Sequence, residues 1–241
     1  MNSPEHWSNA ISNGPYRWTM LIAIALSALY WWLRSRRDPA LLPIYIGALG
    51  GAFIGAKLLY LLAEGWHDWP MPDRWLRLAT GKTVLGGLLG GFVGVEFMKW
   101  LTRYPKATGD KFALIVPLGI ALGRVGCLMQ GCCLGNPTAN RFLAMRDHFG
   151  VSRWPSVPLE LGFQLLMFVV LVIQQRQSRC TGRLFYLYLM AYGAFRFFHE
   201  WLRETPKVIL GISVYQLTAL LLFALGAAMW QRRKPLVSET S

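Results

Sequence analysis

The run LLPIYIGALGGAFIGAKLLYLLA, from Leu41 to Ala63, decides the class of fold, because Lys57 is its single charged residue. A bilayer core about 30 Å thick requires about 20 apolar residues in a helix, so this run predicts a membrane span. Six further runs of this kind lie near Trp18–Leu33, Val84–Leu101, Phe112–Leu134, Val157–Ile173, Leu184–Leu202 and Ile209–Trp230. The sequence therefore predicts an all-α integral membrane protein with seven transmembrane helices in one domain, residues 1–241.

The composition agrees with a membrane protein and disfavours other classes. Of 241 residues, 54% are hydrophobic and 15% are charged, and the mean hydropathy is +0.33, which is too apolar for an ordinary soluble domain. The formal net charge of +13 would suggest a nucleic-acid partner in a soluble protein. Here the basic residues lie between apolar runs, so we expect them to face anionic membrane lipids, and we expect no nucleic-acid partner.

The positions of the basic residues predict the orientation. Lys and Arg are retained on the cytoplasmic side during insertion, and they cluster most densely after the first, third and fifth runs and in the C-terminal tail, as at Arg34, Arg36 and Arg37. We therefore expect a periplasmic N-terminus and a cytoplasmic C-terminus.

Several charged side chains fall inside apolar runs, where burial costs about 3 kcal/mol or more. Glu96 and Lys99 lie one helical turn apart and are expected to pair. Arg124 lies in the middle of its run and is expected to face an interior cavity. Arg196 is followed by Glu200 and Arg203 on the same helix face, which suggests either a structural ion pair of Arg196 with Glu200 or an anion site formed by Arg124 and Arg196.

Glycine doublets are the other signal. They are Gly50-Gly51, Gly86-Gly87 and Gly90-Gly91, with Gly94 following. Small residues let membrane helices pack closely, which is the first interpretation. The amides of Gly86 and Gly87 could also hold an anion where the chain re-enters the membrane, and both roles can coexist.

Five segments occur in the order found in one known family. They are Gly55-Ala56-Lys57-Leu58-Leu59-Tyr60, Leu85-Gly86-Gly87-Leu88-Leu89-Gly90, Gly123-Arg124-Val125-Gly126-Cys127-Leu128-Met129-Gln130-Gly131-Cys132-Cys133-Leu134-Gly135, Tyr192-Gly193-Ala194-Phe195-Arg196 with Glu200 and Arg203, and Ile212-Ser213-Val214-Tyr215-Gln216. The third resembles the signature G-R-x-G-N-x-x-N-G-E-x-x-G, and the fourth resembles Y-G-x-x-R-x-x-x-E-x-x-R. Taken together, the chain resembles the prolipoprotein diacylglyceryl transferases of the bacterial inner membrane.

The resemblance implies transfer of the diacylglyceryl group from phosphatidylglycerol to the lipobox cysteine thiol of a preprolipoprotein. It implies release of glycerol phosphate at the periplasmic face and the use of no metal or organic cofactor. The resemblance implies Arg124, Arg196 and Glu200 as catalytic residues, and we add Cys127 and Cys132 as candidate catalytic thiols near Arg124. The candidate substrate-binding residues are Lys57, Tyr60, Gly86, Gly87, Gln130, Glu160 and Arg203, with His199 added because it lies three residues after Arg196.

Some positions depart from the family pattern. Leu85 stands where the family has a histidine before the glycine doublet, Cys127 replaces an asparagine and Cys132 replaces a glutamate. A leucine accepts no proton, so another group must act as the base, the thiol must lose its proton to water, or the branch has different chemistry. His199, His67 and His148 are alternative proton acceptors.

The cysteine cluster Cys127, Cys132 and Cys133 leaves four interpretations open. Buried cysteines commonly pack as small hydrophobic residues, and a disulfide is compatible with an oxidising outer face. A metal site would lack a histidine or a further cysteine at a recognised spacing. A thiolate beside Arg124 could act as a base or a nucleophile.

Alternative functions remain at this point. The first keeps the lipid donor and uses a different, small thiol or amine as acceptor. The second is a lipid or anion binder, or a transporter, without catalysis. The third is a redox protein that uses the cysteine cluster.

Overall fold

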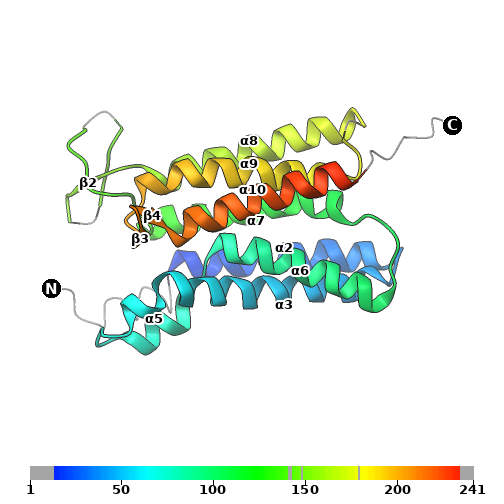
Figure 1. Cartoon of the computed structure of the whole chain (residues 1–241), viewed down its shortest axis with the longest axis horizontal. Helices are drawn as coiled ribbons and strands as arrows, with labels where there is room; N and C mark the ends of the chain where they lie inside the picture. Colours follow the sequence, from blue (N-terminus) through cyan, green and yellow to red (C-terminus); the bar gives the residue numbers. More distant parts are fainter. Residues whose placement is uncertain (1–13, 141–142, 148, 179, 234–241) are drawn as a thin grey trace. The chain divides into compact units, whose positions relative to one another are not determined.

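The computed structural model describes residues 14–140, 143–147, 149–178 and 180–233 (Figure 1). In the described residues the architecture is helical, with two short hairpins. The helices are α2 (Pro15–Ser35), α3 (Leu41–Tyr60), α4 (Trp66–Asp68), α5 (Arg74–Thr80), α6 (Val84–Thr102), α7 (Gly109–Gln130), α8 (Ser156–Arg176), α9 (Leu184–His199) and α10 (Val214–Arg232). A π-helical turn η1 (Leu61–Gly65) extends α3, and a 3-10 turn η2 (Glu200–Leu202) extends α9.

Among the residues that the structure describes, five helical segments are long and apolar enough to cross a membrane. They are Leu41–Asp68, Val84–Thr102, Gly109–Gln130, Ser156–Arg176 and Val214–Arg232. This confirms the prediction of an all-α membrane protein. The helix α9 is 16 residues long, which places it below the length of the five. The N-terminal helix α2 is not among them either, although it has 21 residues.

Two predicted spans end or begin at the wrong residue. The run predicted to reach Leu134 stops being helical at Gln130, because Gly131 adopts a left-handed conformation with φ of 65° and reverses the chain. The run predicted to begin at Ile209 begins as a helix at Val214. The residues before it pair as the antiparallel strands β3 (Lys207–Ile209) and β4 (Ile212–Ser213).

The chain divides into two compact units, which we describe separately. The first holds the described residues within 14–24, 107–205 and 219–233. The second holds residues 25–106 and 206–218.

In the second unit, α3 and α6 pack through six interlocking glycines. They are Gly47, Gly51 and Gly55 on α3 and Gly86, Gly90 and Gly94 on α6, spaced four residues apart on each helix. A Cβ at Gly90 would lie 2.1 Å from the carbonyl oxygen of Gly51, and one at Gly51 would lie 2.3 Å from that of Gly90. The packing interpretation is therefore confirmed for Gly51, Gly86, Gly90 and Gly94, because no side chain fits between the two backbones. It is wrong for Gly50, where a Cβ would meet nothing within 4 Å.

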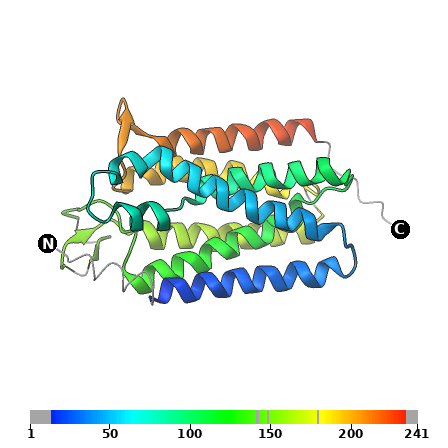
Figure 2. The ribbon, with the colours of Figure 1, turned by 90° about the horizontal axis from the view of Figure 1, so that it is seen from below.

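In the first unit, α7, α8 and α9 pack against one another (Figures 1 and 2). The chain between α7 and α8 carries the hairpin of β1 (Met145–Arg146) and β2 (Ser152–Arg153). The C-terminal ends of α7 and α9 and the N-terminal end of α8 meet in this unit, which brings Arg124, Glu160 and Arg196 into one region.

Candidate functional site

A cluster of buried charges lies where α7, α8 and α9 meet. Its members are Arg124 on α7, Glu160 on α8, Arg196 and His199 on α9, and Glu200 at the start of η2. All five are buried, and the two glutamates have no exposed surface. A buried charge is costly unless it is paired, so the pairings decide what this cluster can do.

Arg124 pairs with Glu160 across the interface of α7 and α8. Arg124 Nη2 lies 2.9 Å from Glu160 Oε2, and the Tyr192 hydroxyl of α9 donates to Glu160 Oε1 at 2.7 Å. The carboxylate therefore joins three helices. One turn after Glu160 on α8, and one turn before Tyr192 on α9, the Tyr188 hydroxyl donates to Gln164 Oε1 at 2.9 Å.

Arg196 is held on α9 by residues from its own helix end. Its Nη1 lies 2.9 Å from Glu200 Oε2, which confirms the predicted ion pair. Glu200 is also shared, because Arg203 Nε lies 4.0 Å from the same oxygen and the Thr205 hydroxyl donates to Glu200 Oε1 at 2.7 Å. The carboxylate of Glu200 thus places the guanidinium groups of Arg196 and Arg203, whereas Arg124 is placed by Glu160.

His199 has both ring nitrogens engaged. Nε2 lies 2.8 Å from the carbonyl oxygen of Ser156, which can only accept, so Nε2 carries the proton. Nδ1 then accepts from Arg196 Nη1 at 2.9 Å. This geometry argues against His199 as a proton acceptor and makes it a residue that positions Arg196. His67 is exposed and stacks on Trp66 in the second unit, and His148 lies outside the described residues.

The cluster and Arg203, which directly follows η2, form a set that carries one positive charge in excess. It combines the guanidinium groups of Arg124, Arg196 and Arg203 with the carboxylates of Glu160 and Glu200, and the charges of Arg196 and Arg203 also act on Glu160. The buried Nε atoms of Arg124 and Arg196 have no hydrogen-bond acceptor among the described residues. Such a set can accept a phosphate monoester or diester, which supplies both negative charge and acceptor oxygens.

Beyond Gln130, the chain turns back over the end of α7. The amide of Cys132 donates to the carbonyl oxygen of Cys127 at 3.1 Å, the bond that closes a Schellman turn with Gly131 at its left-handed position. Gly135 then passes between two segments of backbone. A Cβ there would lie 2.6 Å from the carbonyl oxygens of both Leu202 and Trp154, so this position of the signature requires glycine.

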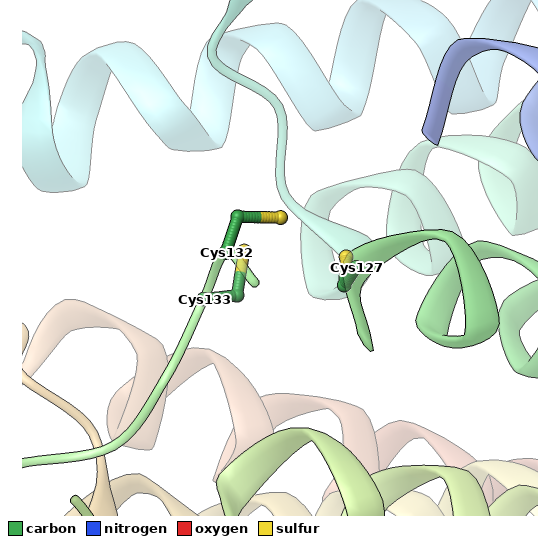
Figure 3. A group of neighbouring side chains, drawn as sticks. All are labelled: Cys127, Cys132 and Cys133. Carbon is green, nitrogen blue, oxygen red and sulfur yellow. The ribbon is translucent and has the colours of Figure 1, made fainter. Parts of the chain in front are cut away.

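The turn gathers the three cysteines, whose sulfur atoms all lie within 4.8 Å of one another (Figure 3). All are free thiols; Cys127 is buried, Cys132 is half-buried and Cys133 is exposed. Arg124 Nη1 lies 3.9 Å from Cys127 Sγ. Interactions with the Cys127 and Cys132 thiols, and then the charges of Arg203 and Arg124, lower the pKa of Cys133 well below its ordinary value.

Four of the predicted substrate-binding residues lie in the second unit, and each forms a hydrogen bond within that unit. Lys57 Nζ lies 3.4 Å from the carbonyl oxygen of Gly81, and the Tyr60 hydroxyl donates to Asp68. The amide of Gly86 donates to Thr83 Oγ1 at 3.2 Å and that of Gly87 to the Thr83 carbonyl oxygen at 3.0 Å. Both amides are thus engaged locally, which favours packing and helix capping over anion binding at this doublet.

Four other positions singled out in the sequence lie on α6 and α7. Glu96 and Lys99 pair at 3.2 Å, as predicted. Leu85 lies in the first turn of α6, is 1% exposed and belongs to the buried apolar core. Gln130 is the last residue of α7 and is partly buried.

Sequence reasoning did not assign roles to Tyr192, Tyr188 or Gln164. The sequence feature that corresponds to them is a pair of equal spacings of four residues, from Glu160 to Gln164 on one helix and from Tyr188 to Tyr192 on the other. These spacings indicate two hydrogen bonds between the helices only once the helices are known to run antiparallel and side by side.

The fold and the site define the class: a multi-pass helical membrane protein with a buried cluster of arginines and glutamates. The chain belongs to the prolipoprotein diacylglyceryl transferase family, whose model matches residues 15–232. It is similar to phosphatidylglycerol–prolipoprotein diacylglyceryl transferases from several bacteria. The enzyme of Symbiobacterium thermophilum is 29% identical over 255 residues, covering 96% of this chain and 95% of that protein. That of Chlorobaculum tepidum is 30% identical over 214 residues, covering 78% and 73%. That of Pseudoalteromonas atlantica is 27% identical over 252 residues, covering 93% and 88%.

Proposed function

We propose that this chain transfers the diacylglyceryl group of phosphatidylglycerol to a cysteine thiol of a prolipoprotein. The names of its relatives supply the donor and the acceptor class. The family match over most of the chain supports carrying that reaction over. The acceptor we propose is the lipobox cysteine.

The observation that carries the proposal is the buried cluster together with Arg203, which gives the set an excess positive charge. In the reaction, the sulfur–hydrogen bond of the acceptor thiol breaks and its proton passes to water. The sulfur forms a bond to the glycerol carbon that bears the phosphate, and the carbon–oxygen bond to phosphate breaks. The electron pair of that bond leaves with the phosphate, as glycerol phosphate. A fixed guanidinium group lowers the barrier, because it stabilises charge that grows on the leaving oxygen.

The geometry supports a division of roles. We propose that Arg124 and Arg196 hold the phosphate, and that Arg203 adds its charge from the other side of Glu200. Glu160 and Glu200 then act by keeping the guanidinium groups in place, since each lies 2.9 Å from one of them. Tyr192 fixes Glu160, and His199 fixes Arg196, through the hydrogen bonds described above.

We further propose that the whole chain is one membrane domain with seven spans, in which α2 and α9 complete the five helices identified above. With the N-terminus periplasmic and the C-terminus cytoplasmic, the end of α7, the start of α8 and the end of α9 all face the periplasm. The charge cluster lies at these ends. This arrangement supports an active site open to the periplasm in a bacterial inner membrane.

The test is transfer by the purified protein in detergent micelles. The substrates are phosphatidylglycerol with a labelled acyl chain and a synthetic peptide with a lipobox cysteine, and the product is a thioether detected by mass spectrometry. A peptide with serine in place of cysteine should give no product. The proposal fails if the protein binds the lipid and releases no glycerol phosphate with the cysteine peptide.

Arg124→Lys tests the assigned role, because it keeps a charge near Glu160 and removes the two-pronged donor. We expect the transfer rate to fall by about 10²–10³-fold, the effect of removing one donor to a developing anion. Arg176→Ala is the control, since Arg176 is exposed in the last turn of α8. Equal rates for the two variants, with equal elution on size exclusion, would remove Arg124 from the site.

A further inference from the structure

The thiol cluster, defined as Cys127, Cys132 and Cys133, is not used by the transfer reaction proposed above. Cys127 lies in the last turn of α7, and the other two lie on the segment that follows it (Figure 3). In the part of the chain that the structure describes, this group of potential metal ligands consists of cysteines alone.

The backbone holds the cluster in place before any ligand arrives. The Schellman turn returns Cys132 toward Cys127, and Cys133 has a left-handed φ of 60°. A non-glycine residue in that region costs about 1–2 kcal/mol. The Ser156 hydroxyl donates to the carbonyl oxygen of Cys133 at 2.9 Å and fixes this conformation from α8. The three sulfur atoms are therefore brought together by the fold.

The spacing of the sulfur atoms fits one metal ion. A metal about 2.3 Å from each of three sulfurs in one plane sets the sulfurs about 4 Å apart. The sulfurs lie within 4.8 Å of one another, so closing around an ion requires shifts below an ångström. Rotation about the Cα–Cβ bond of the exposed Cys133 can supply such a shift, and its exposure gives the ion a route of entry.

We propose that the thiol cluster binds a single soft, monovalent metal ion of the Cu(I) class through three sulfur ligands. Thiolate sulfur selects soft ions, whereas Mg²⁺ and Ca²⁺ require oxygen ligands. A structural Zn²⁺ site requires four protein ligands, and this cluster offers three. Binding is a ligand exchange without electron transfer: up to three sulfur–hydrogen bonds break, up to three sulfur–metal bonds form, and the protons pass to water.

The surroundings suit the charge of the product. Three thiolates and one monovalent ion carry a net charge of −2. The guanidinium group of Arg124 lies 3.9 Å from Cys127 Sγ, and it offsets part of this charge. The proposal is independent of the transfer reaction, because metal uptake measures it directly.

The experiment is a competition for Cu(I) with the whole protein in detergent. The thiols are reduced and the reductant is removed under nitrogen, and the probe is Cu(I) held by the coloured chelator bathocuproine disulfonate. We expect the protein to withdraw one equivalent per chain. X-ray absorption of the loaded protein should show a first shell of three sulfurs.

Four cysteine-to-serine variants make the test specific. Cys127→Ser, Cys132→Ser and Cys133→Ser should each weaken Cu(I) binding by at least about 10-fold, since each removes one soft ligand. Cys180→Ser is the matched control, because Cys180 lies in the turn between α8 and α9 and outside the cluster. It should bind as the wild type does.

Several results would overturn the proposal. One is a wild-type protein that withdraws no copper, and another is any single cluster variant that binds as tightly as the wild type with unchanged elution. A third is a disulfide between two cluster cysteines in protein taken from membranes without reductant, seen as protection from alkylation. Loss of binding in Cys180→Ser would also contradict it, since the ion would then lie elsewhere.

Discussion

The ion pair of Arg124 and Glu160 gives the sharpest test of how the charge cluster is built. Glu160→Gln keeps the size of the side chain and an oxygen that can accept from the Tyr192 hydroxyl, so the change removes charge and little else. It leaves the guanidinium of Arg124 without its carboxylate at a site where the arginine side chain is 9% exposed. Removing one partner of a buried pair costs about 3–5 kcal/mol.

Glu204→Gln is the matched control. It is the same substitution at a glutamate whose side chain is 67% exposed and which lies 2.9 Å from Arg153 Nη1, and Arg153 keeps its bond to Asp147 in this variant. A pair that reaches solvent is worth about 0–1 kcal/mol, so this variant should change the stability little. For a chain of this size, each kcal/mol moves the melting temperature by about 2–4 °C.

The assay is thermal unfolding of both variants in the same detergent, followed by tryptophan fluorescence. We expect Glu160→Gln to lower the melting temperature by about 6–20 °C, and Glu204→Gln to lower it by less than about 4 °C. Arg124→Gln combined with Glu160→Gln leaves no unpaired charge and should recover part of the loss. An equal shift in melting temperature for Glu160→Gln and for the control would refute the role given to this pair. So would a double variant whose loss equals the sum of the losses measured for Arg124→Gln and Glu160→Gln separately.

Two further predictions concern other parts of the molecule. Gly90→Ala places a methyl group 2.1 Å from the carbonyl oxygen of Gly51 and should cost about 1–3 kcal/mol in thermal unfolding, whereas Gly87→Ala, with its nearest contact at 3.7 Å, should not destabilise; equal losses would contradict the interlocked packing. The hydrogen bond from Arg153 lowers the pKa of Asp147 in the β1–β2 hairpin, so this carboxylate stabilises the hairpin above its unfolded pKa of about 3.9, and the contribution is lost as the pH falls through the lower folded value. Hydrogen exchange of the hairpin, corrected for intrinsic rates, should therefore accelerate below about pH 4 in the wild type and be fast at all pH values in Asp147→Asn; an unchanged profile in the variant would exclude this carboxylate as the cause.

The sequence by itself determined the class of fold, because the lengths of apolar runs are set by the thickness of the bilayer. It also determined local pairings. Arg196 meets Glu200, and Glu96 meets Lys99, because residues three or four apart share one face of a helix. The sequence singled out Arg124 and Glu160 separately and did not pair them.

The sequence did not determine the precise ends of two spans. Hydrophobic residues continue past Gln130 and begin before Val214, so composition does not mark where the helices end or begin. A left-handed glycine at Gly131 and strand pairing before Val214 decided these boundaries. Both depend on hydrogen bonds that an apolar run does not record.

Only the tertiary structure decided which partners meet across helices. Arg124 lies beside Glu160 because α7 packs on α8, and both nitrogens of His199 are engaged because α9 approaches the Ser156 carbonyl of α8. The three sulfurs likewise depend on a turn and on a bond from α8 to Cys133. Contacts between distant residues follow from how the helices pack, and periodicity within one helix carries no information about its neighbour's register.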